Sequence, residues 1–166
     1  MEIKKITRLS MLLGISVVLN IVETFIPVFN GTIPGLKLGL ANVITLIVLY
    51  LYSFKDALSL SLLRVLLVGI LRNGIFSITF FFSLGGAILS VIVMTMFKKT
   101  KLSIIGVSII GSISHSIGQV LIAVLLLKNI YIIYYVPWLL LFSVPTGIFT
   151  GMISKKSINH LQNRLQ

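Results

Sequence analysis

Residues 102–127 read LSIIGVSIIGSISHSIGQVLIAVLLL and contain no Asp, Glu, Lys or Arg. A helix of this length would be about 39 Å long at 1.5 Å per residue, whereas the hydrocarbon core of a bilayer is ~30 Å thick. Large aliphatic side chains occur on every side of such a helix, so no face of it suits water. The stretch therefore predicts a helix that crosses a membrane.

Five more apolar segments accompany this one, in a chain of 166 residues of which 57% are hydrophobic and 10% charged. A soluble domain of this length needs far more polar surface to cover its core. We therefore expect an all-α membrane protein that crosses the cytoplasmic membrane several times. Residues 1–166 would form a single integral membrane domain, a six-transmembrane-helix bundle. The six expected segments are residues 8–27, 38–52, 56–71, 76–97, 102–127 and 132–153.

The second and third segments are short, about 22–24 Å as helices, which is less than the thickness of the hydrocarbon core. Two topologies are open: two full spans, or a re-entrant hairpin over residues 38–71. Both leave the two termini on the same side of the membrane. The first segment follows a basic stretch, as in a signal peptide, but no A-x-A-like cleavage site follows it, so we expect a retained helix.

Basic residues are distributed unevenly over the expected connections. The net charge is +11, from 14 Lys and Arg against three acidic residues. With six spans and cytoplasmic N- and C-termini, basic residues are concentrated inside, the bias that orients membrane helices. We expect these charges to meet membrane lipids and no nucleic acid. The inside set is Lys4, Lys5, Arg8, Lys55, Lys98, Lys99, Lys101, Lys155, Lys156 and Arg164, and the outside set is Lys37, Arg72 and Lys128.

Polar side chains recur at helical spacing within the apolar segments, where lipid offers them no hydrogen-bond partner. Each such stripe predicts a helix face that points into the bundle. In the third segment, Ser61 and Arg64 share a face, and Asn42 lies near the start of the second. The stripes are Ser108, Ser112, His115 and Gln119; Ser16, Asn20 and Glu23; and Thr79, Ser83, Gly86 and Ser90.

Arg64 is the most informative of these residues, because an arginine at mid-depth costs about 2.5–3.5 kcal/mol even on lenient insertion scales. It should therefore face the bundle interior or a wet cavity. Two interpretations are open. Arg64 forms an internal ion pair with Glu23, or it offers positive charge, together with Lys37, to an anionic ligand that enters from outside. The two are compatible if Glu23 neutralises the site in part.

The candidate substrate-binding residues supply charge or hydrogen bonds near the outer half of the bundle. Asn42 and Gln119 would orient a ligand or bridge helices, and His115 would be a hydrogen-bonding side chain or a proton relay. The outer connection, residues 27–39 (PVFNGTIPGLKLG), contains prolines and glycines that oppose regular helix. It would fold over the outer face or simply reverse the chain. The candidates are Glu23, Lys37, Asn42, Arg64, His115 and Gln119.

Absent residue types exclude several kinds of chemistry. The chain has no cysteine, and hence no disulfide, thiolate metal site or cysteine nucleophile. It has no Walker A or H-E-x-x-H motif. Asp56 is the sole aspartate, so no aspartate pair is available to hold Mg²⁺. We therefore expect no enzymatic activity, no catalytic residue, no metal site and no cofactor.

Four blocks of the sequence are PGLKLGLAN (residues 34–42), RVLL (64–67), FSLGGA (82–87) and SHSIGQ (114–119). In this order they resemble the Gx transporter family, also described as heptaprenyl diphosphate synthase component I, over essentially the whole chain. The family is similar to the substrate-binding (S) components of energy-coupling-factor (ECF) transporters. Those are six-helix membrane proteins that capture vitamins and cofactor precursors from outside. The resemblance implies a coupling subunit and ATPase subunits as partners.

The resemblance also implies a docking face on the first helix, where S components carry an Ala-x-x-x-Ala pattern. Ser10 and Gly14 are the nearest equivalent here, whereas the G-x-x-x-G pair Gly147 and Gly151 is expected to pack the bundle. One functional hypothesis is an S-component-like protein that captures a small anionic or amphipathic, cofactor-related molecule from outside. The alternative is a non-catalytic membrane subunit of a heptaprenyl (polyprenyl) diphosphate synthase.

Overall fold

The computed structural model describes residues 2–23 and 40–165, and within them the chain is helical, with short connections and no strand. The all-α class expected from the sequence is confirmed for these residues. The elements are α1 (Glu2–Glu23), α2 (Leu40–Leu51), α3 (Phe54–Val68), the π-helix η1 (Gly69–Asn73), α4 (Ile78–Lys98), α5 (Ile104–Leu127), the 3₁₀-helix η2 (Ile130–Tyr135) and α6 (Val136–Leu165).

Four helices, α1, α4, α5 and α6, are long and apolar enough to cross a membrane. Large hydrophobic side chains stand exposed along all four, as expected of surfaces that face lipid rather than water. The membrane character predicted from the sequence is therefore confirmed at this level. The candidate spans are Ile3–Glu23, Ile78–Lys98, Ile104–Leu127 and Val136–Gln162.

Helices α2 and α3 are short, with 12 and 15 residues, or about 18 and 22 Å. The shortness predicted for these segments is confirmed. Every residue from Val43 to Leu49 is buried, so α2 is covered on all sides by its neighbours. These are α1, α3, α4 and α6. The length of a helix enclosed in this way does not have to match the thickness of the bilayer, because protein rather than lipid surrounds it.

The ends of the first and last helices differ from the expected segments. α1 begins at Glu2 and α6 continues to Leu165, past the hydropathy limit at residue 153. Hydropathy detects the part of a helix that faces lipid, but polar residues such as Lys and Gln also favour helix. In α6, Ile158 is buried in the core although the polar residues Ser157 and Asn159 flank it. Packing therefore extends the helix beyond its apolar part.

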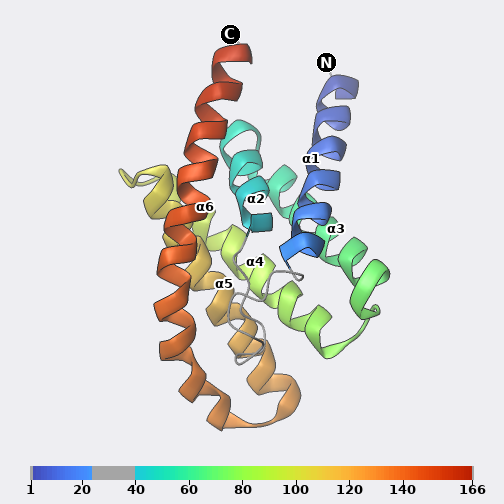
Figure 1. Cartoon of the computed structure of the whole chain (residues 1–166), viewed down its shortest axis with the longest axis vertical. Coiled ribbons are helices and arrows are strands. Elements are labelled where there is room, and N and C mark those ends of the chain that lie inside the picture. The colour runs from blue at the N-terminus through green and yellow to red at the C-terminus, as the bar shows by residue number, and fades with distance from the viewer. Residues whose placement is uncertain (1, 24–39, 166) are drawn as a thin grey trace.

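Both termini lie at the same end of the molecule (Figure 1). At this end Lys5 Nζ of α1 lies 2.8 Å from Asp56 Oδ2 in the first turn of α3. Lys98 Nζ, at the end of α4, donates to the carbonyl oxygen of Leu49 near the end of α2 (2.6 Å). The α2–α3 turn therefore lies beside the start of α1, and the end of α4 lies beside the end of α2.

Glycines let α5 approach both of its neighbours closely. A Cβ on Gly118 would lie 2.7 Å from the backbone oxygen of Gly85 in α4. On the other side, a Cβ on Gly147 or Gly151 of α6 would lie 2.6 or 2.8 Å from the nearest α5 backbone atom. The G-x-x-x-G pair thus packs α6 on α5, the packing role expected for it.

Candidate ligand-binding cavity

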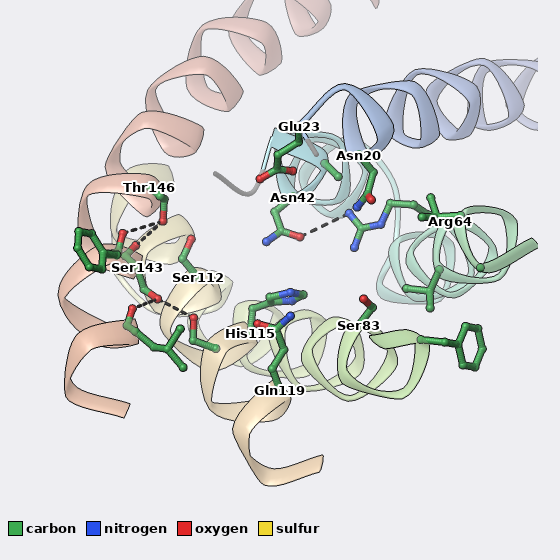
Figure 2. A pocket seen from close by; sticks show the side chains of 18 residues that line it. Asn20, Glu23, Asn42, Arg64, Ser83, Ser112, His115, Gln119, Ser143 and Thr146 are labelled. Atoms are coloured by element: carbon green, nitrogen blue, oxygen red, sulfur yellow. Dashed lines mark hydrogen bonds between the residues drawn. The ribbon is translucent and has the colours of Figure 1, made fainter. Parts of the chain in front are cut away.

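A cavity lies between the α-helices α1 to α6, and most of the side chains that line it are polar (Figure 2). The space open to the centres of water molecules is about 60 Å³. Every α-helix contributes to the wall, so the cavity exists only in the assembled bundle. The lining residues are Asn20, Glu23, Ala41, Asn42, Arg64, Val65, Val68, Gly69, Phe80, Ser83, Ser112, His115, Ser116, Gln119, Leu139, Phe142, Ser143 and Thr146.

The cavity lies in the half of the bundle away from the termini. The half near the termini is filled by an apolar core that includes Leu49, Met94, Val107 and Ile158. By contrast, the cavity is lined by residues from the last turn of α1 and the first turn of α2. Hydrophobic packing closes one half of the bundle, and polar side chains line a space in the other.

Arg64 projects from α3 into this space, and its side chain is 3% exposed. Its guanidinium donates to three neutral oxygens at long distances: Asn42 Oδ1 (3.5 Å), Thr45 Oγ1 (3.4 Å) and Ser61 Oγ (3.4 Å). Among the described residues, its buried Nε–H has no hydrogen-bond partner. Short, well-aligned bonds normally accompany a buried charge, so this guanidinium keeps unused donor capacity.

Glu23 provides a negative charge in the same cavity. Its side chain is 4% exposed, and its carboxylate attracts the Arg64 guanidinium electrostatically. Figure 2 shows both side chains directed toward the central space. Asn20, one turn earlier on α1, has a buried Oδ1 that accepts no hydrogen bond from any residue the structure describes. The α1 side of the cavity therefore carries oxygen acceptors, on Asn20 and Glu23. The α3 side carries the N–H donors of Arg64.

The polar stripe of α5 divides between two roles along the helix. Ser108 is hydrogen-bonded to Thr150 of α6 (2.8 Å) and fixes the two helices together. Ser112, His115 and Gln119 line the cavity instead.

Gly86 of α4 makes room for the α5 side chains. A Cβ at this position would lie 2.8 Å from the backbone oxygen of His115, and 2.9 Å from both His115 Cε1 and Gln119 Cγ. Any larger residue would displace one or both side chains, because the contacts are shorter than real Cβ atoms tolerate. Gly86, which the sequence placed in a polar stripe, therefore positions two candidate residues.

Part of the cavity wall was not among the candidates from the sequence. Ser116 of α5 and Ser143 of α6 share a hydrogen bond (2.7 Å), and Ser143 also donates to the Leu139 carbonyl (2.6 Å). The Thr146 hydroxyl donates to the carbonyl oxygen of Phe142, one turn earlier in the same helix (3.1 Å). The sequence pattern that could have predicted them is the spacing of Ser143 and Thr146, three residues apart in an otherwise apolar segment.

Five of the six candidate binding residues from the sequence line this one cavity, namely Glu23, Asn42, Arg64, His115 and Gln119. The shared face of Ser61 and Arg64 is confirmed by their hydrogen bond. Lys37 and the connection at residues 27–39 lie outside the described residues. Ligand binding by the five stays a prediction.

The proposed docking pair lies elsewhere. Ser10 and Gly14 are exposed on α1, and a Cβ on Gly14 would meet nothing within 4 Å. The face is therefore open, and its role in docking stays a prediction. Within residues 2–23 and 40–165, no three His, Asp or Glu side chains gather in a way that could hold a metal ion.

Long apolar helices around a cavity with a buried guanidinium define an all-helical protein of membrane type with an internal polar site. The chain belongs to the family described as heptaprenyl diphosphate synthase component I, whose model matches residues 12–157. The family recognised from the four sequence blocks is thereby confirmed. No curated protein and no solved structure matches the chain.

Proposed function

We propose that this protein is a multi-pass substrate-binding component of the cytoplasmic membrane, which captures a small molecule from outside in the cavity around Arg64. The observation that carries the proposal is the state of Arg64: a buried guanidinium with three long bonds to neutral groups and an unmatched Nε–H. A buried charge of this kind is costly unless it is well paired. A bound ligand with an acceptor group would supply the missing partner.

The proposed topology has six crossings with both termini in the cytoplasm. The basic side chains near the end that carries the termini outnumber those near the other end, which supports this orientation. Helices α2 and α3 would complete the six crossings under cover of the longer helices, with the turn from Ser53 to Asp56 at the cytoplasmic surface. The cavity then opens in the outer half. The two described groups are Lys4, Lys5, Arg8, Lys55, Lys98, Lys99, Lys101, Lys155 and Lys156 at the first end, and Arg72 and Lys128 at the other.

The protein would act without catalysing a reaction itself. Asp56, the sole aspartate, caps α3 and pairs with Lys5, far from the cavity lining. A component that captures a ligand needs others to supply energy. In the ECF-like form of the proposal, a coupling subunit and ATPase subunits do so, and they dock on the exposed α1 face at Ser10 and Gly14.

A second candidate follows from the family description, a non-catalytic membrane component of a heptaprenyl diphosphate synthase. In this case a soluble synthase would bind the cytoplasmic end, where Lys99 and Lys101 are exposed beside the α4–α5 connection. The cavity would then be a secondary feature. The two candidates differ in the surface that carries the function.

Copurification separates the two candidates. The tagged protein is extracted from its own membranes in a mild detergent, and its protein partners are identified by mass spectrometry. We expect ATPase and coupling subunits with the wild type, and their loss when Gly14 is replaced by Leu on the exposed α1 face. Recovery of a prenyl diphosphate synthase, lost on Lys99→Ala with Lys101→Ala, would replace the first candidate by the second.

Ligand capture is tested with Arg64→Met, which keeps much of the side-chain volume and removes the charge. Small molecules released by denaturing the purified wild type and variant are compared by unbiased mass spectrometry. We expect a molecule that is enriched in the wild type and depleted about 30-fold or more in the variant, as for loss of a buried charge contact. Leu63→Ala, on the exposed face of α3, is the matched control. Equal small-molecule content in wild type and Arg64→Met would contradict the proposal.

A further inference from the structure

We infer that the ligand of this cavity is a small zwitterion, which carries one acidic group and one amino group. The inference rests on the proposed binding function and narrows it. Three features of the cavity lead to this class of molecule: its charge balance, its two unmatched polar atoms and its size.

The charge balance concerns Arg64 and Glu23. Among the described lining residues, Arg64 brings one full positive charge and Glu23 one negative charge, and both side chains are almost fully buried. Beside these two opposite and buried charges, a ligand with a net charge would have no counter-charge left among the described lining residues, at a large desolvation cost. A diphosphate would add several uncompensated charges. A zwitterion adds none, because each of its poles can face the protein charge of opposite sign.

The unmatched atoms have opposite hydrogen-bonding character. Within the part of the chain that the structure describes, Arg64 Nε–H has no acceptor and Asn20 Oδ1 has no donor. A carboxylate accepts and does not donate, so it would satisfy Arg64 and leave Asn20 unmatched. An amino group donates and would satisfy Asn20, beside Glu23 on the same helix. One molecule with both groups completes both sites.

The described part of the cavity has room for a small molecule. A space of about 60 Å³ for water centres holds on the order of four to six water molecules. This is the scale of a small amino acid rather than of a long isoprenoid chain. Val65 and Phe80, which belong to one apolar cluster, form an apolar part of the wall, where a short hydrocarbon side chain would lie.

The test identifies the chemical class of the small molecule that the purified full chain retains. Small molecules released from the wild type and from Arg64→Met are compared, and the enriched species is fragmented to identify its ionisable groups. We expect both an acidic and an amino group. An enriched species with an acidic group or a diphosphate and no amino group would overturn this inference and leave the proposed function intact. No enriched species at all would overturn both.

Two variants then test the amino end. Glu23→Gln removes the negative charge, and Asn20→Leu removes the acceptor without a change in charge. We expect each to lower the retained zwitterion, Glu23→Gln by about 30-fold or more, because it leaves the amino pole unpaired. Each variant is scored as a monodisperse, folded protein, with Leu63→Ala as the control that leaves the cavity intact. Full retention by both folded variants would overturn the inference.

Discussion

Arg64 and Glu23 have opposite charges in one cavity, yet the hydrogen bonds described for Arg64 go to neutral side chains. Their mutual stabilisation is therefore expected to be modest. A double-mutant cycle with Arg64→Met, Glu23→Gln and the double variant should give a coupling energy of about 1 kcal/mol or less in unfolding measurements. Residues in direct contact within one salt-bridge network reach coupling energies of about 2–3 kcal/mol in such a cycle. A coupling in that range would favour the ion-pair interpretation.

The sequence indicated which side chains face inward, but not which of them line the cavity. Ser90 and Ser83 belong to one stripe of α4, yet Ser90 donates to the Gly111 carbonyl (2.9 Å) and Ser83 lines the cavity. On α5, likewise, Ser108 bridges two helices and Ser112 lines the cavity. A serine that bridges two helices and a serine that faces a cavity obey the same spacing. The difference depends on the gap between helices at that depth, which the neighbouring helix determines.

At the scale of helices, the α4–α5 contact depends on Gly118. Gly118→Ala would bring its Cβ to 2.7 Å from the backbone oxygen of Gly85, and backbone cannot move aside as a side chain can. We expect a loss of about 1–3 kcal/mol in unfolding free energy, typical of overpacking. Gly106→Ala is the matched control on the same helix, because its Cβ would meet no atom closer than 3.6 Å. Equal stability of the two variants would contradict this account of the contact.

The turn between α2 and α3 is held by Asp56. Partial burial by itself raises the pKa of Asp56, but hydrogen bonds from Lys5 and from the Ser53 hydroxyl and N–H outweigh it and lower this pKa. The charged form is therefore favoured by folding. Its stabilisation is complete above the unfolded pKa of about 3.9 and is lost as the pH falls through the lower folded pKa.

Asp56→Asn should accordingly lower the unfolding free energy at pH 7 by about 0.5–1 kcal/mol, as for a partly exposed ion pair. The difference from wild type should shrink as the pH falls below about 4. Thermal unfolding in detergent over this pH range measures it. Lys55→Gln, an exposed neighbour, serves as the control. If the difference in unfolding free energy between wild type and Asp56→Asn is unchanged at low pH, the charged carboxylate is not its source.

Hydropathy was sufficient to predict the helices that face lipid. It was less informative about a helix that protein encloses. α5 runs from Ile104 to Leu127, close to the expected segment of 102–127, because lipid exposure and helix coincide there. α2 is an apolar helix that protein covers on all sides, so its composition alone says little about whether it crosses the membrane. Its place follows from the packing of four other helices, which the pattern of one segment does not contain.

For the whole molecule, the open question from the sequence was whether residues 38–71 form two spans or a re-entrant hairpin. Lys5 joins α1 to the α2–α3 turn, and Lys98 joins the end of α4 to the end of α2. Two connections of the chain, α2–α3 and α4–α5, therefore share one end with the termini (Figure 1). A hairpin that turned back within the membrane would bury the charges of this turn at mid-depth, at high cost. The arrangement thus favours two crossings.

The absence of native cysteine makes this topology directly testable, because every introduced thiol is unique. Lys55→Cys, in the α2–α3 turn, should react with a membrane-impermeant maleimide from the cytoplasmic side, as Lys99→Cys should at the α4–α5 connection. Lys128→Cys, after α5, should react from outside in intact cells. Six crossings require the first two to share a side opposite the third. If Lys55→Cys reacts from neither side while Lys99→Cys and Lys128→Cys behave as expected, the turn lies within the membrane and the re-entrant topology holds.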